Sequence, residues 1–298
     1  MFPIISGNTA IPEGNKEGLF AFGGTSNTRN LISSAGVIAS DASGAGTARN
    51  NLGACEYGDD KGIFGYGSGK VNMSNLVSNT GVVSADGPSV GTGRYTPGAC
   101  AYGGDKGIFG YGNQVAGTTY ANVTNKVSNL GVVASDTAGV GTARYALTAC
   151  EYGEDKGIFG YGSSQAQTAG TNLTNKVSNA GVVASDTAGV GTSRTWLSAC
   201  AYGAPYMDKG MFGFGSISPI TNITNLVSNT GVVSADQAAT TGTARSGLAS
   251  TQYGGDKAMF GFGGASNIIN KVSNAGVVAS DTSGVGTARD GLEACSFN

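Results

Sequence analysis

The feature of this sequence that most limits its fold is a tandem repeat of about fifty residues. Six arginines mark the register of the repeat at intervals of 45, 50, 50, 51 and 44 residues: Arg49, Arg94, Arg144, Arg194, Arg245 and Arg289. An aspartate precedes each arginine by eight residues, or by nine in the fifth case: Asp41, Asp86, Asp136, Asp186, Asp236 and Asp281. A second marker, KGIFGYG or a variant of it, begins at Lys16, Lys61, Lys106, Lys156, Lys209 and Lys257. Repetition on this scale is typical of solenoids, propellers and other arrays of small units.

One complete unit, residues 143–194, contains four candidate strands separated by turn signals. They are Tyr145–Tyr152, Lys156–Tyr161, Asn172–Ser178 and Gly181–Ser185, and a tight Gly-Glu-Asp turn joins the first two. Short apolar runs bounded by Gly, Asn, Asp and Ser predict strands, and no segment keeps a helical period. Six units of four antiparallel strands predict an all-β fold, namely a six-bladed β-propeller.

The second strand of each unit predicts how neighbouring units pack. Phe159 and Tyr161 stand two residues apart, which places them on one face of a strand, with Ile158 and Gly160 on the other. Equivalent pairs occur in the other five units: Phe20/Phe22, Phe64/Tyr66, Phe109/Tyr111, Phe212/Phe214 and Phe260/Phe262. We expect the aromatic face of one unit to pack over the glycine-lined face of its neighbour, large against small.

The two ends of the chain each carry part of a unit. The chain begins at a second strand, Gly18–Gly23, and ends after a first strand, Gly291–Phe297. We expect the C-terminal strand to pair with the N-terminal strands and close the ring, because closure removes open sheet edges. Residues 1–298 are then one propeller domain with an N-terminal arm, residues 1–13, that either docks onto a larger assembly or covers strand edges. The alternative, an open solenoid, requires polar capping repeats at both ends.

The unit resembles a Kelch repeat in the arginine before its innermost strand and in the apolar second strand that ends in glycines. A double glycine stands at Gly23–Gly24 and Gly263–Gly264, and the motif is GYG or GFG elsewhere. The tyrosine and tryptophan that the family carries later in the repeat are missing, since the fourth strand reads GVVASD or a variant. The array YGxDKGIFGYG…VSNxGVVASD…GTAR also resembles Kelch-like proteins of marine bacteriophages. That resemblance covers the whole chain and implies a virion component.

Composition excludes several classes of function. The chain has no histidine, which excludes a Ser-His-Asp triad and leaves the usual zinc and copper sites without their ligands. A net charge of -2 lacks the basic surface that nucleic-acid binding requires. No apolar run approaches the roughly 18 residues of a membrane helix, so no membrane insertion is expected. The first residues do not read as a secretory signal.

Cysteines follow the repeat as well. Five stand six residues after their arginine, at Cys55, Cys100, Cys150, Cys200 and Cys295, and Thr251 takes the sixth position. The odd count and the absence of a partner within the same unit predict buried free thiols rather than disulfides. Such thiols fit synthesis in a reducing cytoplasm. A metal-binding ring of thiolates is the alternative, and Thr251 interrupts it, so we expect no metal and no cofactor.

The twelve repeated aspartates and arginines have two interpretations. As scaffold, each aspartate accepts hydrogen bonds in its turn and meets a neighbouring arginine, which makes the set a structural ring. As a functional ring, they would line one mouth of the channel. The scaffold interpretation is favoured, because identical groups in every unit are expected from structure and an active site normally breaks the symmetry.

Binding residues are therefore sought where the repeat departs from itself. The loop after the second strand varies in length and carries Thr118, Tyr120, Gln165 and Gln167 in its longest versions. An insertion in one hairpin adds Tyr206, and the only tryptophan, Trp196, stands where the preceding unit has Ala146. Side chains of this kind suit either a carbohydrate or a protein partner, and neutral variation of surface loops is the competing explanation.

These observations predict a non-enzymatic structural or adhesive module, and the resemblance implies that it belongs to a bacteriophage virion, on the tail or capsid, assembled in the host cytoplasm. Its partners would be other virion proteins, further copies of the chain, or a glycan or protein of the host surface. The second hypothesis is a carbohydrate-binding propeller for host recognition. The third is an enzyme such as a glycosidase, which needs two carboxylates facing each other across a pocket. Because the carboxylates are mostly repeat markers, we expect no catalytic residues.

Overall fold

The protein is all-β. The computed structural model describes residues 15–114, 119–164, 170–204, 207–216, 218–238, 240 and 242–298. These residues form six three-stranded antiparallel sheets and one short two-stranded sheet, and they contain no helix long and apolar enough to cross a membrane. The all-β class predicted from the repeat is confirmed.

Each three-stranded sheet corresponds to one repeat unit. In the order of hydrogen-bonded neighbours, the sheets are β20 (Glu293–Phe297), β1 (Glu17–Ala21) and β2 (Arg29–Ile32); β3 (Gly53–Tyr57), β4 (Lys61–Gly65) and β5 (Ser74–Val77); β7 (Gly98–Tyr102), β8 (Lys106–Gly110) and β10 (Thr124–Val127); β11 (Thr148–Tyr152), β12 (Lys156–Gly160) and β13 (Thr174–Val177); β14 (Ser198–Tyr202), β15 (Lys209–Gly213) and β16 (Thr224–Val227); and β17 (Ala249–Tyr253), β18 (Lys257–Gly261) and β19 (Ile269–Val272). The short pair is β6 (Arg94–Tyr95) and β9 (Asn113–Gln114).

The predicted fourth strand is not a continuous strand. In the unit of β11–β13, Val183 forms a single bridge with Val177, and Thr187 forms another with Thr174. Val177 and Thr174 are three positions apart on β13, whereas their bridge partners Val183 and Thr187 are four positions apart. The outer segment therefore has one extra residue, which interrupts the ladder as a bulge does. The interruption lies at Asp186, whose carboxylate turns inward and accepts a hydrogen bond from Asn175.

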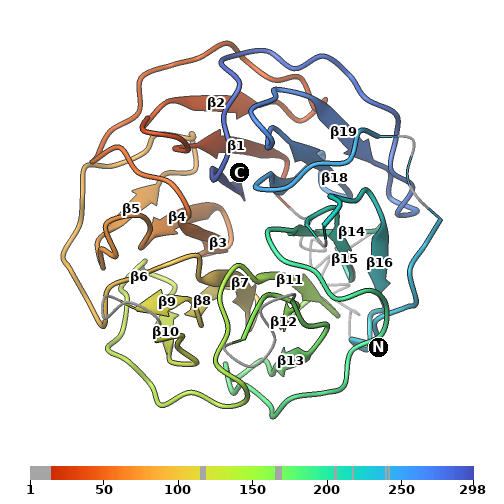
Figure 1. Ribbon diagram of the computed structural model, residues 1–298. Helices are drawn as coiled ribbons and strands as arrows, with labels where there is room; N and C mark the ends of the chain where they lie inside the picture. The colour runs from red at the N-terminus through yellow and green to blue at the C-terminus, as the bar shows by residue number, and fades with distance from the viewer. Residues whose placement is uncertain are drawn as a thin grey trace, which may run out of the picture.

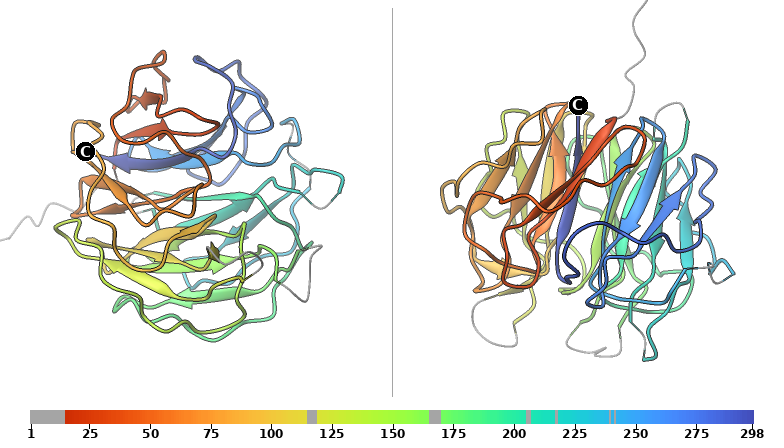
Figure 2. Two further views of the ribbon diagram at one scale, coloured as in Figure 1. Left: turned by 60° about the vertical axis from the view of Figure 1, so that its left-hand side comes forward. Right: turned by 90° about the horizontal axis from the view of Figure 1, so that it is seen from above.

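The six sheets lie around a common centre, with the first strand of each unit innermost (Figure 1). These inner strands are neighbours in the order β3, β7, β11, β14, β17 and β20, and β20 also lies beside β3. Seen from above, the strands run across the thickness of a short cylinder, and β20 takes its place among strands from the start of the chain (Figure 2).

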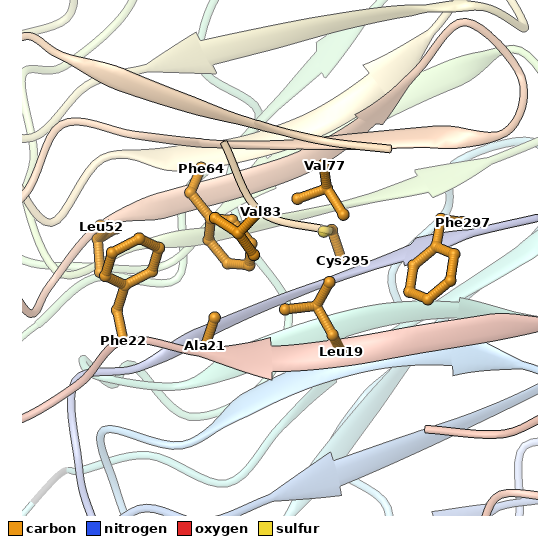
Figure 3. Close-up of a cluster of buried hydrophobic side chains, with 9 residues drawn as sticks. All are labelled: Leu19, Ala21, Phe22, Leu52, Phe64, Val77, Val83, Cys295 and Phe297. Atoms are coloured by element: carbon orange, nitrogen blue, oxygen red, sulfur yellow. The ribbon is translucent and has the colours of Figure 1, made fainter. Parts of the chain in front are cut away.

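The two chain ends meet in one sheet, as the two part-units predict. β20 pairs with β1 over five residues, with Leu19 opposite Cys295. Side chains from this sheet pack against the next one: Leu19 and Ala21 of β1 face Phe64 of β4 and Val77 of β5 (Figure 3). The joint between the ends is therefore a buried apolar core and not a surface contact.

The aromatic residues join neighbouring sheets, but not from one shared face as predicted. Phe159 packs on the sheet before it, where a Cβ added at Gly110 would lie 2.8 Å from its Cζ atom. Tyr161 instead contacts Phe212 of the sheet that follows, with ring centres 5.1 Å apart. The expected alternation fails because β12 ends at Gly160 and Tyr161 has a φ of 65°, which turns its side chain to the other side. The prediction of large against small holds for the phenylalanine alone.

The cysteines are free and buried, as predicted. Four of the thiols lie against a glycine in the second strand of the following sheet, and Cys200 shares a core cluster with Ala258, which stands in the equivalent place. A Cβ added at Gly157 would lie 2.4 Å from the Sγ of Cys100, and the same contact joins Cys150 to Gly210. At the four glycine positions, a hydrogen in place of a side chain allows the neighbouring inner strand to approach closely.

Candidate functional site

The repeated aspartates and arginines bind the backbone and neighbouring side chains of their unit, and in four units the guanidinium also lies 3.6 to 3.9 Å from the aspartate. Arg94 donates to Asn125 Oδ1 at 2.6 Å and to the Thr92 carbonyl at 3.1 Å, and its Nη1 lies 3.9 Å from Asp136 Oδ1. Asp136 accepts hydrogen bonds from Thr92 and Asn125. Burial would raise the pKa of Asp136, but these hydrogen bonds and the Arg94 charge lower it.

The same network recurs around the molecule. In every unit the threonine two residues before the arginine donates to the aspartate: the sets are Thr47/Arg49/Asp86, Thr92/Arg94/Asp136, Thr142/Arg144/Asp186, Thr192/Arg194/Asp236, Thr243/Arg245/Asp281 and Thr287/Arg289/Asp41. Each guanidinium also lies over an aromatic ring of the preceding sheet, as Arg94 does over Tyr66 at 4.1 Å. These charges thus hold each sheet together and seal it to its neighbour.

Two of the loop residues selected from the sequence meet in an aromatic cluster. Tyr120 stacks on Tyr145 with ring centres 4.6 Å apart, and Tyr145 meets Trp196 edge-on at 6.3 Å. Tyr95 lies close enough for its charge to help raise the pKa of Tyr145. We call Tyr95, Tyr120, Tyr145 and Trp196 the aromatic cluster. All four side chains are partly exposed. Sequence reasoning selected Tyr120 and Trp196 but missed Tyr95 and Tyr145. Both tyrosines follow a repeated arginine, at a position where the other four units have a residue that is not aromatic: Asn50, Thr195, Ser246 and Asp290.

The other selected residues, Thr118, Gln165, Gln167 and Tyr206, lie outside the residues that the structure describes. Loop ends that flank three of them are placed. Asn113 bridges to Tyr120 across the loop of residue 118, and Ser163 bridges to Tyr145 just before residue 165. Both loops therefore start beside the aromatic cluster.

Trp196 also belongs to a circle of backbone around the mouth of the central channel. We call this circle the collar. A leucine or proline precedes each inner strand, and the collar consists of the residue before it, namely Asn51, Thr96, Ala146, Trp196, Gly247 and Gly291. All six have φ between 51° and 66°. Hydrogen bonds of 2.6 to 3.0 Å join five of the six neighbouring pairs from N–H to carbonyl, including Asn51 to Gly291 and Gly247 to Trp196. This conformation explains why the predicted strand Tyr145–Tyr152 begins only at Thr148.

Below the collar, the inner strands line a narrow channel. Alternate residues of each inner strand face it, so that the layer next to the collar contains Leu147 and Leu197, and deeper layers contain Ala149 and Glu151. The space divides into three cavities of about 30 Å³ each, room for roughly two water molecules apiece.

Three carboxyl groups break the symmetry of this channel, and sequence reasoning missed them. Glu56 of β3 and Glu151 of β11 occupy the same position of the repeat and line the same cavity, and Glu293 lies in a layer nearer the collar. Glu56 also accepts hydrogen bonds from the N–H and the hydroxyl of Ser296, at 2.9 and 2.8 Å. The signal in the sequence was the residue after each cysteine, which is glutamate in only two units.

Burial raises the pKa of Glu293 to about 8. Burial and the nearby Glu56 carboxyl raise the pKa of Glu151 well above its ordinary value. All three side chains are half-buried. In the described part of the chain, no group of three or more His, Cys, Asp or Glu side chains is arranged to hold a metal ion.

Fold and site define a class: an all-β protein of repeated small sheets around a narrow channel, with an aromatic cluster beside one mouth. Comparison with known proteins adds no narrower assignment, since no family model and no curated protein sequence matches the chain.

Proposed function

We propose that the chain is a six-bladed β-propeller of the Kelch type, closed by β20. Each blade has three regular strands and an irregular outer segment. The pairing of β20 with β1, the contact of β20 with β3 and the collar hydrogen bond from Asn51 to Gly291 support closure. These contacts join the last unit to the first with the same geometry that joins the other units.

The propeller serves as a non-enzymatic adhesive module of a bacteriophage virion, on its tail or capsid. The observation that carries the adhesive role is the contact of Tyr120, Tyr145 and Trp196 at one mouth of an otherwise regular molecule. Partly exposed Tyr and Trp are the side chains that most often anchor binding surfaces. The virion setting rests on the resemblance of the repeat array to phage Kelch-like proteins, and the partners would be other virion proteins or a component of the host surface.

The channel carboxyls favour binding over catalysis. Glycosidase carboxyls stand about 5 to 9.5 Å apart so that a sugar lies between them. Glu56 and Glu151 instead line one small cavity together. The cavity around them has a volume of about 30 Å³, which is too small for a sugar ring.

Two measurements on the phage that encodes the chain test this function. Antibodies against the purified protein should label intact particles at a defined position, and an excess of the free protein should compete with particles for adsorption to host cells. Absence of the chain from purified particles excludes the virion role. Labelled particles whose adsorption does not respond to the free protein indicate a purely structural component and exclude the adhesive one.

A further inference from the structure

We infer that the aromatic cluster is a carbohydrate-binding site in which a neutral sugar ring lies against Trp196 and Tyr120 at the rim of the collar. The inference rests on the proposed adhesive function and gives its ligand a chemical class. It is carried by backbone strain, by the chemistry of the exposed groups and by the shape of the mouth.

Backbone strain at Trp196 is the first step. The collar conformation, with φ of 55° at Trp196, is easy for glycine and costly for a bulky residue, by roughly 1 to 2 kcal/mol. Two units meet the demand with Gly247 and Gly291 and a third with Asn51, a residue that tolerates this region. Positive φ elsewhere, as at Tyr161, recurs with an aromatic residue in all six units and therefore belongs to the scaffold. Thr96 and Ala146 share the conformation, but only at Trp196 does a strained collar residue also present an aromatic ring, which is the pattern of a residue retained for binding.

The chemistry of the cluster is the second step. Its aromatic faces supply apolar surface, while hydroxyl groups line its edge. Asn113 donates to the Tyr95 hydroxyl at 3.3 Å, and the backbone of Ser163 pairs with that of Tyr145. The Oδ1 atom of Asn113 is buried without a hydrogen-bond partner. A pyranose has the complementary surface, a flat patch of C–H groups edged by hydroxyls that donate and accept.

Charge narrows the ligand further. Among the described residues, Lys70 brings a charge to the cluster, with its Nζ 5.7 Å from the centre of the Tyr95 ring. A single cation near Tyr95 is not the arginine cluster with which proteins bind phosphate or acidic motifs. The ligand is accordingly neutral in the part that meets Trp196.

The shape of the mouth favours a ligand that lies on the collar over one that enters it. The cavity lined by Trp196, Leu197 and Gly247 has a volume of about 30 Å³ and cannot admit a side chain such as Leu or Phe. A flat ring resting against the aromatic wall, above Gly247 and Gly291, needs no deeper space.

A glycan array probed with the labelled full-length protein tests the inference, followed by titration of the best neutral oligosaccharide against three variants. Trp196→Gly and Tyr120→Ala should each weaken binding at least about tenfold, because each removes an aromatic contact. Ala146→Gly is the matched control. It relieves the same collar strain without touching an exposed ring, so it should raise the melting temperature and leave affinity within about twofold.

The outcomes separate this inference from the proposed function. An array without any bound glycan, or a titration in which Trp196→Gly binds like the parent protein, overturns the carbohydrate site, and the adsorption experiment still decides the adhesive role. Trp196→Gly also removes backbone strain, so the variant is expected to stay folded. Loss of binding by the folded variant then reports the loss of the aromatic ring and not unfolding. Selective binding of anionic glycans that persists without Trp196 overturns the neutral-ring assignment.

Discussion

Arg289 donates a hydrogen bond of 2.6 Å to Oδ1 of Asn30, and the two residues are 259 positions apart in the chain. The equivalent bond of Arg194 to Asn225 has the same length and spans 31 positions. The Arg–Asn bond therefore joins residues near one another along the chain in the other units. In the sheet that holds both chain ends, it joins residues from opposite ends of the chain. Its energy is available only after loop-closure entropy over nearly the whole chain has been lost.

The first prediction tests whether this joint is as strong as its local counterpart. Asn30→Ala and Asn225→Ala should each lower the free energy of unfolding by about 3 kcal/mol, because each leaves a buried guanidinium and a carboxylate without their shared partner. Urea unfolding followed by tryptophan fluorescence measures both. A near-neutral Asn30→Ala beside a costly Asn225→Ala would mean that the ends are not joined in solution.

The second prediction concerns two glycines on the same strand. A Cβ added at Gly160 would lie 2.6 Å from the Cζ of Phe212, a buried ring with no space to move, so Gly160→Ala should cost about 1 to 3 kcal/mol. Gly157→Ala should change stability by less than about 1 kcal/mol. Its Cβ would lie 2.4 Å from the Sγ of Cys100 and 3.2 Å from the Ala101 carbonyl oxygen, and the protein already accommodates Ala258 in the equivalent place, in one core cluster with Cys200.

Melting temperatures of the two variants decide this prediction. If Gly157→Ala and Gly160→Ala lowered the melting temperature equally, the spacing between sheets would be fixed by the backbone and not by the aromatic ring. A harmless Gly160→Ala would place Phe212 away from that glycine.

Much of the fold could be predicted because the repeat states it six times. Arg, Asp and Gly at fixed offsets identify the unit, and the part-units at the chain ends predict that the C-terminal strand pairs with the N-terminal ones, as β20 does with β1. What failed was local geometry. Tyr161 departs from strand alternation through a positive φ, and Asp186 interrupts the outer segment, and neither is visible from residue type alone.

The candidate site was predicted less completely, for a physical reason. Trp196 and Tyr120 stand out as departures from the repeat, but their contact through Tyr145 depends on how neighbouring loops converge at the collar. Glu56 and Glu151 are 95 positions apart and meet only because a channel brings their inner strands around one axis. Comparing units position by position, with attention to the residue after each cysteine, would have identified them.

The third prediction concerns the cysteines. Burial raises the pKa of Cys200 to about 12 and that of the other four thiols well above the ordinary value. At pH 8 the native protein should therefore contain almost no thiolate and react with none of its five thiols in minutes, whereas the urea-unfolded chain should react at all five. Labelling with a thiol reagent followed by mass spectrometry measures the count, and rapid modification of any cysteine in the native state would contradict its burial.

The last prediction assigns part of the pH dependence of stability to Glu293. Its pKa in the folded protein is about 8, against 4.5 for an ordinary glutamate, so between these values the folded state holds a proton that the unfolded chain has released. The contribution is complete below pH 4.5 and is lost as the pH rises to 8, on the order of 2 to 4 kcal/mol. Glu293→Gln stays neutral at every pH. The variant should match the parent protein near pH 5 and exceed it in stability at pH 8 to 9.

The repeated aspartates act in the opposite direction and define the acid limb. Hydrogen bonds from Thr92 and Asn125 lower the pKa of Asp136 despite its burial, so its contribution is present at neutral pH and is lost as the pH falls below 4. Urea unfolding at intervals from pH 3 to 9 should give a maximum between the two limbs for the parent protein. In Glu293→Gln only the alkaline limb should flatten, while the control Glu154→Gln, which removes an equal charge from an exposed turn, should leave both limbs in place. An unchanged alkaline limb in Glu293→Gln would mean that this carboxyl is ionised within the folded channel at neutral pH.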